Sequence, residues 1–233
     1  MKYVLCYSGG KDSTAMLIHL LKRGQRIDEI IYVDVGDWIW DEASTHIDNV
    51  EKTLNVDITR LPIEAELHKG FEKYGFPSFK RRWCTGIKNT AIKKYIQQNY
   101  PDTEVTQYIG YTYDEINRMN RSMNTPFFVN FPLIEHRITH EMCWDMCSEY
   151  NFDFGGVYEH RNNFNCWLCP LMKNKELEQL YYSHPQLFDK LRDMQKRTDG
   201  YYKSEKTVFD FEKEFWEDNY DFLKNKRLEA RAS

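Results

Sequence analysis

Short apolar segments alternate along this chain with longer segments whose apolar residues recur at helical spacing. Strand-like apolar runs cover residues 1–7, 29–35, 56–61 and 105–111. Helical spacing follows the first run to about residue 24 and recurs over 41–54 and 85–98. Strands and helices that alternate in this way are typical of a mostly parallel sheet covered by helices. The pattern therefore predicts a doubly wound α/β fold with helices on both faces.

The C-terminal part of the chain has a different pattern. From residue 176 onward, leucine and aromatic residues recur at roughly helical intervals, and from residue 207 phenylalanine and tryptophan alternate with charges. We expect C-terminal helices there, the last of which closes the fold. Because we find no repeat, low-complexity segment or convincing linker, residues 1–233 are expected to form a single domain.

The junction between the first strand and the first helix carries the strongest chemical signal. It reads Tyr7-Ser-Gly-Gly-Lys-Asp-Ser-Thr14. Gly9 and Gly10 permit a tight turn and the close approach of a ligand, and a helix N-terminus offers unpaired amides to an anion. Ser8 and Ser13 add hydroxyl groups, Lys11 adds a positive charge, and Asp12 can cap the helix or orient the loop. This junction predicts a phosphate-binding loop, although it matches neither common glycine-rich nucleotide motif.

Charge and cysteine usage narrow the class of protein. The formal net charge is −4, which argues against a uniformly basic nucleic-acid surface. Lys80 to Arg82, with Lys88 after them, fit either a solvated helix face or a clamp for phosphate or sulfate. Neither a bilayer-spanning apolar run nor a signal peptide is visible, so we expect a cytoplasmic protein without a membrane partner. The 6 cysteines are then expected to be reduced thiols or metal ligands.

The Ser-Gly-Gly-Lys-Asp-Ser string resembles the PP-loop of the ATP pyrophosphatase superfamily, whose members typically cleave ATP between its α and β phosphates. Four later segments resemble its phosphoadenylylsulfate (PAPS) reductase-like branch. They are Arg82-Trp-Cys-Thr85 with Lys88, the segment from Tyr108 to Arg118, Phe131-Pro-Leu-Ile134, and Asn165-Cys-Trp-Leu-Cys-Pro170. Thr112 stands where this branch often has an arginine, and Asn165 where it has a glycine. The resemblance implies an adenine nucleotide alpha hydrolase-like fold.

Residues around the loop are assigned roles on this basis. Asp34 ends the second predicted strand, where ligands of doubly wound sheets bind, so it is placed beside a ribose or adenine together with Gly110. The phosphates of ATP, or of a related adenylylated nucleotide, would lie on residues 8–13, bridged by Mg²⁺. Lys11, Arg118 and Arg121 are candidates for stabilising the charge that develops during the reaction, and Asp12 joins them as a catalytic candidate.

Cys84, Cys166 and Cys169 are the candidate metal ligands. Cys166 and Cys169 have the C-x-x-C spacing that directs two thiolates at one metal, and redox exchange is the competing use of that spacing. The resemblance adds Cys84 and implies a [4Fe-4S] cluster, for which Zn²⁺ is the alternative. Cys147 or His160 could supply a fourth ligand. Cys143 and Cys147 share a helix face, and we expect them to be core residues instead.

The function that we predict is adenylylation of a substrate by ATP with release of pyrophosphate, coupled to sulfur transfer through the cluster. One alternative is reduction of an adenylylated sulfate. A cysteine near the C-terminus, used by thioredoxin-coupled reductases, is missing after Cys169, and one cysteine stands at Cys84 where related reductases carry a pair. The other alternative is a noncatalytic nucleotide-binding module stabilised by zinc. The expected partners are a nucleotide substrate and a sulfur donor. The sequence does not choose among a nucleobase in tRNA, a DNA phosphate and a small metabolite as the acceptor, nor does it give the oligomeric state.

Overall fold

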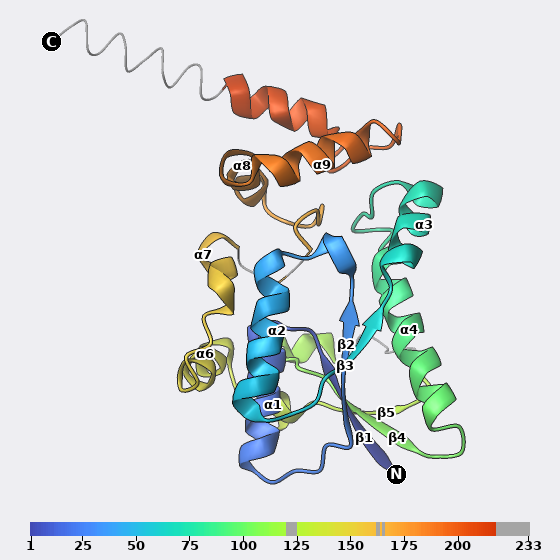
Figure 1. Cartoon of the computed structure of the whole chain (residues 1–233), viewed down its shortest axis with the longest axis vertical. Helices are drawn as coiled ribbons and strands as arrows, with labels where there is room; N and C mark the ends of the chain where they lie inside the picture. The colour runs from blue at the N-terminus through green and yellow to red at the C-terminus, as the bar shows by residue number, and fades with distance from the viewer. Residues whose placement is uncertain (120–124, 162–163, 165, 218–233) are drawn as a thin grey trace, which may run out of the picture. The chain divides into compact units, whose positions relative to one another are not determined.

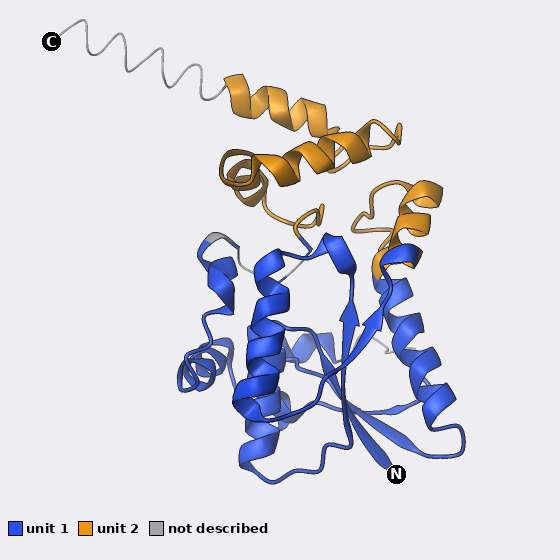
Figure 2. Ribbon diagram, in the orientation of Figure 1, with its two compact units in different colours: residues 1–65, 85–166 blue, residues 66–84, 167–233 orange. Residues whose placement is uncertain are grey.

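The computed structural model describes residues 1–119, 125–161, 164 and 166–217. The chain divides by its internal contacts into two compact units, coloured separately in Figure 2. Unit 1 contains residues 1–65 and 85–166, and unit 2 contains residues 66–84 and 167–233. The prediction that residues 1–233 act as one domain stays a prediction.

Unit 1 is built on a sheet of five parallel strands in the order β3-β2-β1-β4-β5. The strands are β1 (Lys2–Tyr7), β2 (Glu29–Asp34), β3 (Thr59–Pro62), β4 (Val105–Tyr108) and β5 (Phe128–Asn130). The order reverses between β1 and β4, and doubly wound sheets bind ligands at the carboxyl ends of the strands where such a reversal occurs. The predicted phosphate loop follows β1, so it lies at this switch point.

Helices cover both faces of the sheet (Figure 1). On one face, α1 (Lys11–Lys22), α2 (Asp41–Leu54) and α6 (His140–Ser148) enclose a large core that includes Leu5. On the other face, α4 (Trp83–Asn99) packs its residue Ile96 against Val4 and Ile31. Successive residues of β1 thus point to opposite cores, as strand geometry requires. The doubly wound α/β fold predicted from the sequence is confirmed.

The remaining elements of unit 1 are short, and they lie between the longer elements or, for η3 and α7, after α6. They are η1 (Gly36–Trp38), η2 (Tyr113–Arg118), α5 (Pro132–Glu135), η3 (Phe154–Gly156) and α7 (Val157–His160). Thr139 caps α6, because its side chain accepts a hydrogen bond from the Met142 amide at 3.3 Å.

Unit 2 is helical and aromatic. Helix α3 (Glu64–Tyr74) enters it, and α8 (Asn174–Ser183), α9 (Pro185–Gln195) and a helix whose described part covers 208–217 follow the second cysteine motif. Tyr202 is buried within it, 5.0 Å from the ring of Phe76 and with its hydroxyl 3.3 Å from the Leu168 carbonyl oxygen. The expected C-terminal helices are confirmed.

None of the helices in the described ranges combines the length with the apolar character needed to cross a membrane.

Candidate functional site

The predicted phosphate loop connects β1 to α1, and hydrogen bonds within the loop hold its shape. Gly9 has a left-handed φ of 80°, and Gly10 is the extended N-cap of α1. The Ser13 hydroxyl donates to the Gly10 carbonyl oxygen at 2.9 Å and lies 2.9 Å from the Ser8 hydroxyl. The two serines therefore shape the loop themselves, which is a structural role in addition to the ligand contacts predicted for them.

The two glycines also allow two aromatic side chains to approach the loop. A Cβ on Gly9 would lie 3.0 Å from Phe164 Cε1, and a Cβ on Gly10 would lie 3.1 Å from the Tyr158 hydroxyl and 3.2 Å from Phe164 Cβ. All three distances are shorter than an ordinary van der Waals contact, so a larger residue at either position would push these side chains away from the loop. At Gly9 the left-handed backbone also favours glycine.

Lys11 is nearly buried, and its ammonium group lies among polar partners from two helices. The ammonium pairs with the Asp12 carboxylate and lies 2.9 Å from His140 Nδ1. It also lies 6.0 Å from the centre of the Trp144 ring, within reach of a cation–π interaction. His140 and Trp144 both belong to α6, so this helix holds the loop lysine in place.

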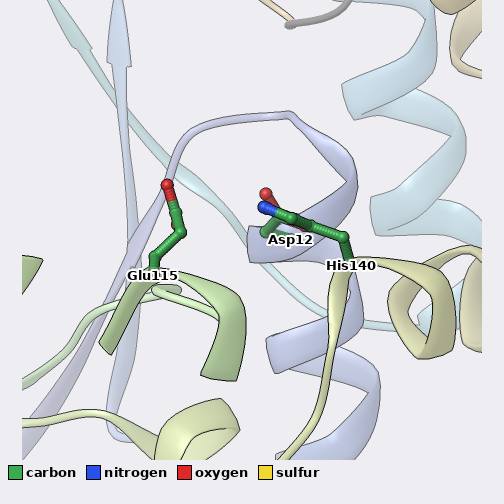
Figure 3. A group of neighbouring side chains, drawn as sticks. All are labelled: Asp12, Glu115 and His140. Atoms are coloured by element: carbon green, nitrogen blue, oxygen red, sulfur yellow. The ribbon is translucent and has the colours of Figure 1, made fainter. Parts of the chain in front are cut away.

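Asp12, Glu115 and His140 form a cluster in which one ligand atom from each residue lies within 4.8 Å of the others. Figure 3 shows the three side chains converging from α1, η2 and α6. The His140 ring is also 3.5 Å from the hydroxyl of Thr112, which is fully buried. Two carboxylates and an imidazole could hold a divalent cation. Sequence reasoning took Asp12 as catalytic but missed Glu115 and His140.

The two arginines assigned to charge stabilisation have different outcomes. Arg118 pairs with Glu115, and its guanidinium lies 4.1 Å from the centre of the Tyr111 ring. Hydrogen bonding and the charge of Glu115 raise the pKa of Arg118 against the opposing effect of its burial, so it stays charged. It is thus connected to the cluster through Glu115. Arg121 lies outside the described residues.

Asp34 and Gly110 occupy different places at the carboxyl edge of the sheet. Asp34 lines a cavity of about 200 Å³ together with Tyr32, Trp40, Ser44 and Arg60, among others. Its carboxylate accepts a hydrogen bond from the Gly36 amide at 2.9 Å. Gly110 instead packs on the start of α1, because a Cβ there would lie 3.2 Å from Ser13 Cα. The cavity at Asp34 suits a small polar or planar group.

The three candidate metal ligands come from both units: Cys84 and Cys169 from unit 2, and Cys166 from unit 1. All six cysteines are free thiols, and these three are half-buried. Lys88 Nζ lies 3.9 Å from Cys166 Sγ. Half-buried free thiols are suitable ligands for a [4Fe-4S] cluster or for zinc. The three-cysteine centre itself stays a prediction.

The Cys143 and Cys147 pair belongs to the core of unit 1, as predicted. Both side chains are fully buried, and the Cys147 thiol donates to the Lys11 carbonyl oxygen at 3.5 Å. Burial raises the pKa of Cys147 to about 12, so the thiol keeps its proton. The role of Cys147 as a fourth metal ligand stays a prediction. The side chain of His160, the other candidate, lies outside the described part of the chain.

A glycine-containing loop at the switch point of a parallel sheet, with a lysine and a carboxylate on its helix, defines a nucleotide-binding α/β protein of the PP-loop class. Residues 2–158 match the model of the phosphoadenosine phosphosulfate reductase domain. The chain belongs to this family.

Relatives with curated sequences are two uncharacterized proteins of Methanocaldococcus jannaschii. MJ0066 is 28% identical over 196 residues, which are 80% of this chain and 40% of the relative. MJ0973 is 27% identical over 202 residues, which are 82% of this chain and 47% of the relative. The chain thus spans less than half the length of either protein.

Among solved structures, the chain is similar to a 4-thiouridine synthetase in complex with RNA and bound ATP. The TM-score is 0.51 and the identity 17%, over 83% of this chain and 50% of the other. At this identity the likeness shows the fold, which agrees with the α/β class derived from the strands.

Proposed function

We propose that this chain is an ATP-dependent enzyme that adenylylates a substrate, releases pyrophosphate and then transfers sulfur to the activated position. The observation that carries this proposal is the position of the loop over residues 8–13, which lies at the switch point and brings Lys11 and Asp12 to the N-terminus of α1. Helix N-termini bind phosphate through free amides and a positive dipole. Family membership supports an adenylylated nucleotide as the ligand.

The Asp12 cluster fits Mg²⁺ with its two carboxylates. Mg²⁺ usually binds through one or two carboxylates and substrate phosphates and keeps several waters. Asp12 and Glu115 would supply those carboxylates. A cation there would also replace Lys11 as the counter-charge of Asp12, which frees the Lys11 ammonium to contact a phosphate oxygen.

In the proposed reaction, a substrate oxygen attacks the α phosphorus of ATP and the bond to the bridging oxygen of the β phosphate breaks. Pyrophosphate leaves and carries the charge that Lys11, Arg118 and Arg121 are proposed to stabilise. The nucleoside would bind near Asp34, in the cavity that Trp40 and Arg60 also line. In the second step, a sulfur nucleophile attacks the adenylylated carbon, AMP leaves with the oxygen, and the sulfur remains on the acceptor.

Cys84, Cys166 and Cys169 would hold the [4Fe-4S] cluster, and such a cluster would supply a site at which sulfur is bound. Three protein thiolates leave one position of the cluster without a protein ligand. Lys88, beside Cys166, places a positive charge next to the thiolate that this role requires. A nucleobase in tRNA is the acceptor that we would test first, followed by DNA and small metabolites.

Pyrophosphate release from ATP tests the proposal. The chain would be purified without oxygen, its iron, sulfide and zinc measured, and pyrophosphate release followed with and without tRNA. Lys11→Ala should abolish release, whereas Lys22→Ala is the matched control, because Lys22 pairs with Glu149 at the exposed opposite end of α1. Unchanged release in Lys11→Ala would reject the assignment. Zinc without ATP cleavage would favour the noncatalytic module.

Reduction of an adenylylated sulfate is the second candidate, and the family match over residues 2–158 favours it. This reaction needs two electrons from an external thiol or protein reductant and yields sulfite and the nucleoside phosphate. Sulfite formed from PAPS or adenylylsulfate and a dithiol, without ATP cleavage, would replace the sulfur-transfer proposal with this one.

A further inference from the structure

The amide at the start of α1 is hydrogen-bonded to a tyrosine from a distant part of the chain. The Lys11 N–H donates to the Tyr158 hydroxyl oxygen at 2.9 Å, although 147 positions separate the two residues. Lys11 is the first residue of α1, so its N–H has no partner within the helix. Tyr158 thus contacts the very group of amides that a bound phosphate would use.

The Tyr158 hydroxyl still has a proton to donate. A phenol oxygen that accepts an N–H keeps its own O–H, so it can accept from the loop and donate outward at the same time. Burial raises the pKa of Tyr158 above its ordinary value, which keeps the proton on the oxygen near neutral pH. The hydroxyl therefore keeps a neutral O–H donor beside the Lys11 amide.

The Tyr158 ring is fixed by aromatic neighbours. The centre of its ring lies 4.8 Å from that of Trp144, 5.1 Å from Phe154 and 6.1 Å from Phe164. The first two contacts are edge-on and the third is stacked, and all three are within the range of favourable aromatic pairs. Displacing the hydroxyl from the loop would require this packing to break. These contacts accordingly fix the position of the Tyr158 ring before any ligand binds.

We propose that Tyr158 is a further phosphate-binding residue of this loop: its hydroxyl accepts the Lys11 amide and donates its proton to an oxygen of the pyrophosphate group of the nucleotide. This inference rests on the proposed function of the loop. It adds to the phosphate site a residue that lies outside the loop motif. The opposite possibility is that the hydroxyl occupies the anion's place and must leave before a phosphate binds. The fixed ring favours the first arrangement.

Calorimetric titration of the full chain with pyrophosphate and with ATP tests the proposal. Tyr158→Phe keeps the ring and its three aromatic contacts but removes the hydroxyl. Tyr150→Phe is the control, because Tyr150 stacks on Phe152 and contacts Lys22, away from the loop. We expect the dissociation constant of pyrophosphate to rise about tenfold in Tyr158→Phe, as for one lost hydrogen bond to a charged group, and to stay unchanged in Tyr150→Phe.

Each other outcome overturns the inference. An unchanged dissociation constant in Tyr158→Phe would show that the hydroxyl does not contact the ligand, and a lower one would show that it competes with the ligand. In both cases the proposed function survives, because the unsubstituted chain still binds. If the unsubstituted chain binds neither pyrophosphate nor ATP, the proposed function fails together with this inference. Thermal unfolding without ligand, compared among the three proteins, checks that each is folded.

Discussion

The Lys11 ammonium lies 2.9 Å from His140 Nδ1, although 129 positions separate the two residues. Lys11 begins α1 and His140 begins α6, and these two helices pack against each other in the core of unit 1. The backbone amide of His140 is held in turn by the Asp114 carboxylate at 2.6 Å. The start of α6 is therefore tied both to the phosphate loop and to the segment that follows β4.

The carboxylates of the Asp12 cluster are predicted to set the requirement for Mg²⁺. Asp12→Asn or Glu115→Gln removes one negative charge and one strong oxygen ligand while keeping the shape of the side chain. We expect the Mg²⁺ concentration for half-maximal pyrophosphate release to rise by about tenfold or more in each variant. The exposed Glu141→Gln on α6 is the control, and it should leave this concentration unchanged. Equal Mg²⁺ dependence in the unsubstituted chain and all three variants would show that Mg²⁺ does not bind at this cluster.

Gly110 is predicted to be required for the geometry of the loop. In Gly110→Ala, the added Cβ would lie 3.2 Å from Ser13 Cα and 3.3 Å from Ser13 N, both backbone atoms of α1. We expect a loss of about 1–3 kcal/mol in the free energy of unfolding, because backbone cannot move aside as a side chain can. The Gly110→Ala variant should also bind ATP more weakly than the unsubstituted chain.

Gly86→Ala is the matched control for this variant. Gly86 lies inside α4, where an added Cβ meets no atom within 4 Å among the described residues. Alanine should there stabilise the fold by about 0.5–1 kcal/mol, since it is the better helix former. Urea unfolding of the two variants should move in opposite directions. A stabilising Gly110→Ala would contradict the close approach of β4's exit to α1.

Features of the fold that depend on local sequence periodicity could be predicted from the sequence more readily than features that depend on tertiary contacts. The helix predicted over 41–54 is α2 (Asp41–Leu54), and the core role of Cys143 and Cys147 followed from their spacing on one helix face. Both inferences use local periodicity. The helix α3 (Glu64–Tyr74) was missed even though its pattern is equally local.

Two strands were predicted with the wrong limits because tertiary contacts decide where strands begin and end. The strand predicted over 105–111 ends at Tyr108, since Gly110 turns toward the backbone of Ser13. The strand predicted from residue 56 begins at Thr59, because the amides of Val56 and Ile58 bond to Glu51 at the end of α2. Hydrophobicity alone does not reveal such contacts.

The sequence predicts the loop motif of the site but not the residues that surround the loop. The residue types of positions 8–13 and their order indicate a phosphate-binding loop. His140, Glu115 and Tyr158 have no motif of their own and join the site only because the fold brings α6, η2 and α7 to the loop. The one available signal was Glu115, which lies within the family-like segment from Tyr108 to Arg118.

Thiol reactivity is predicted to separate the six cysteines into two groups. Burial raises the pKa of Cys6 and of Cys147 to about 12, and it raises that of Cys143 as well. The thiolate is the reactive form, so these three should be modified slowly in the native, metal-free chain at pH 8. Cys84, Cys166 and Cys169 should react first with iodoacetamide, as read by mass spectrometry of the peptides. Reconstitution with iron and sulfide, or with zinc, should protect these three if they form the proposed centre. Protection of Cys143 in their place would contradict the proposed ligand set.

His46 is predicted to make the fold less stable in mild acid. Its side chain is 4% exposed, lies among Phe152, Phe154 and Phe164, and has its Nε2 without a partner in the described part of the chain. Burial lowers the pKa of His46 to about 4, and the charge of Asp153 only partly opposes this effect. Between pH 6.5 and 4 the unfolded chain therefore binds a proton that the folded chain does not.

Because the unfolded state binds more protons in this window, the free energy of unfolding falls as the pH drops below 6.5, by up to about 3 kcal/mol from His46 alone. His46→Leu cannot take up a proton, so its urea midpoint should fall less between pH 7 and pH 5 than that of the unsubstituted chain. An equal fall of the urea midpoint in the two proteins would contradict this prediction. It would show that the His46 imidazole is protonated in the folded chain and that its aromatic surroundings admit water or a counter-ion.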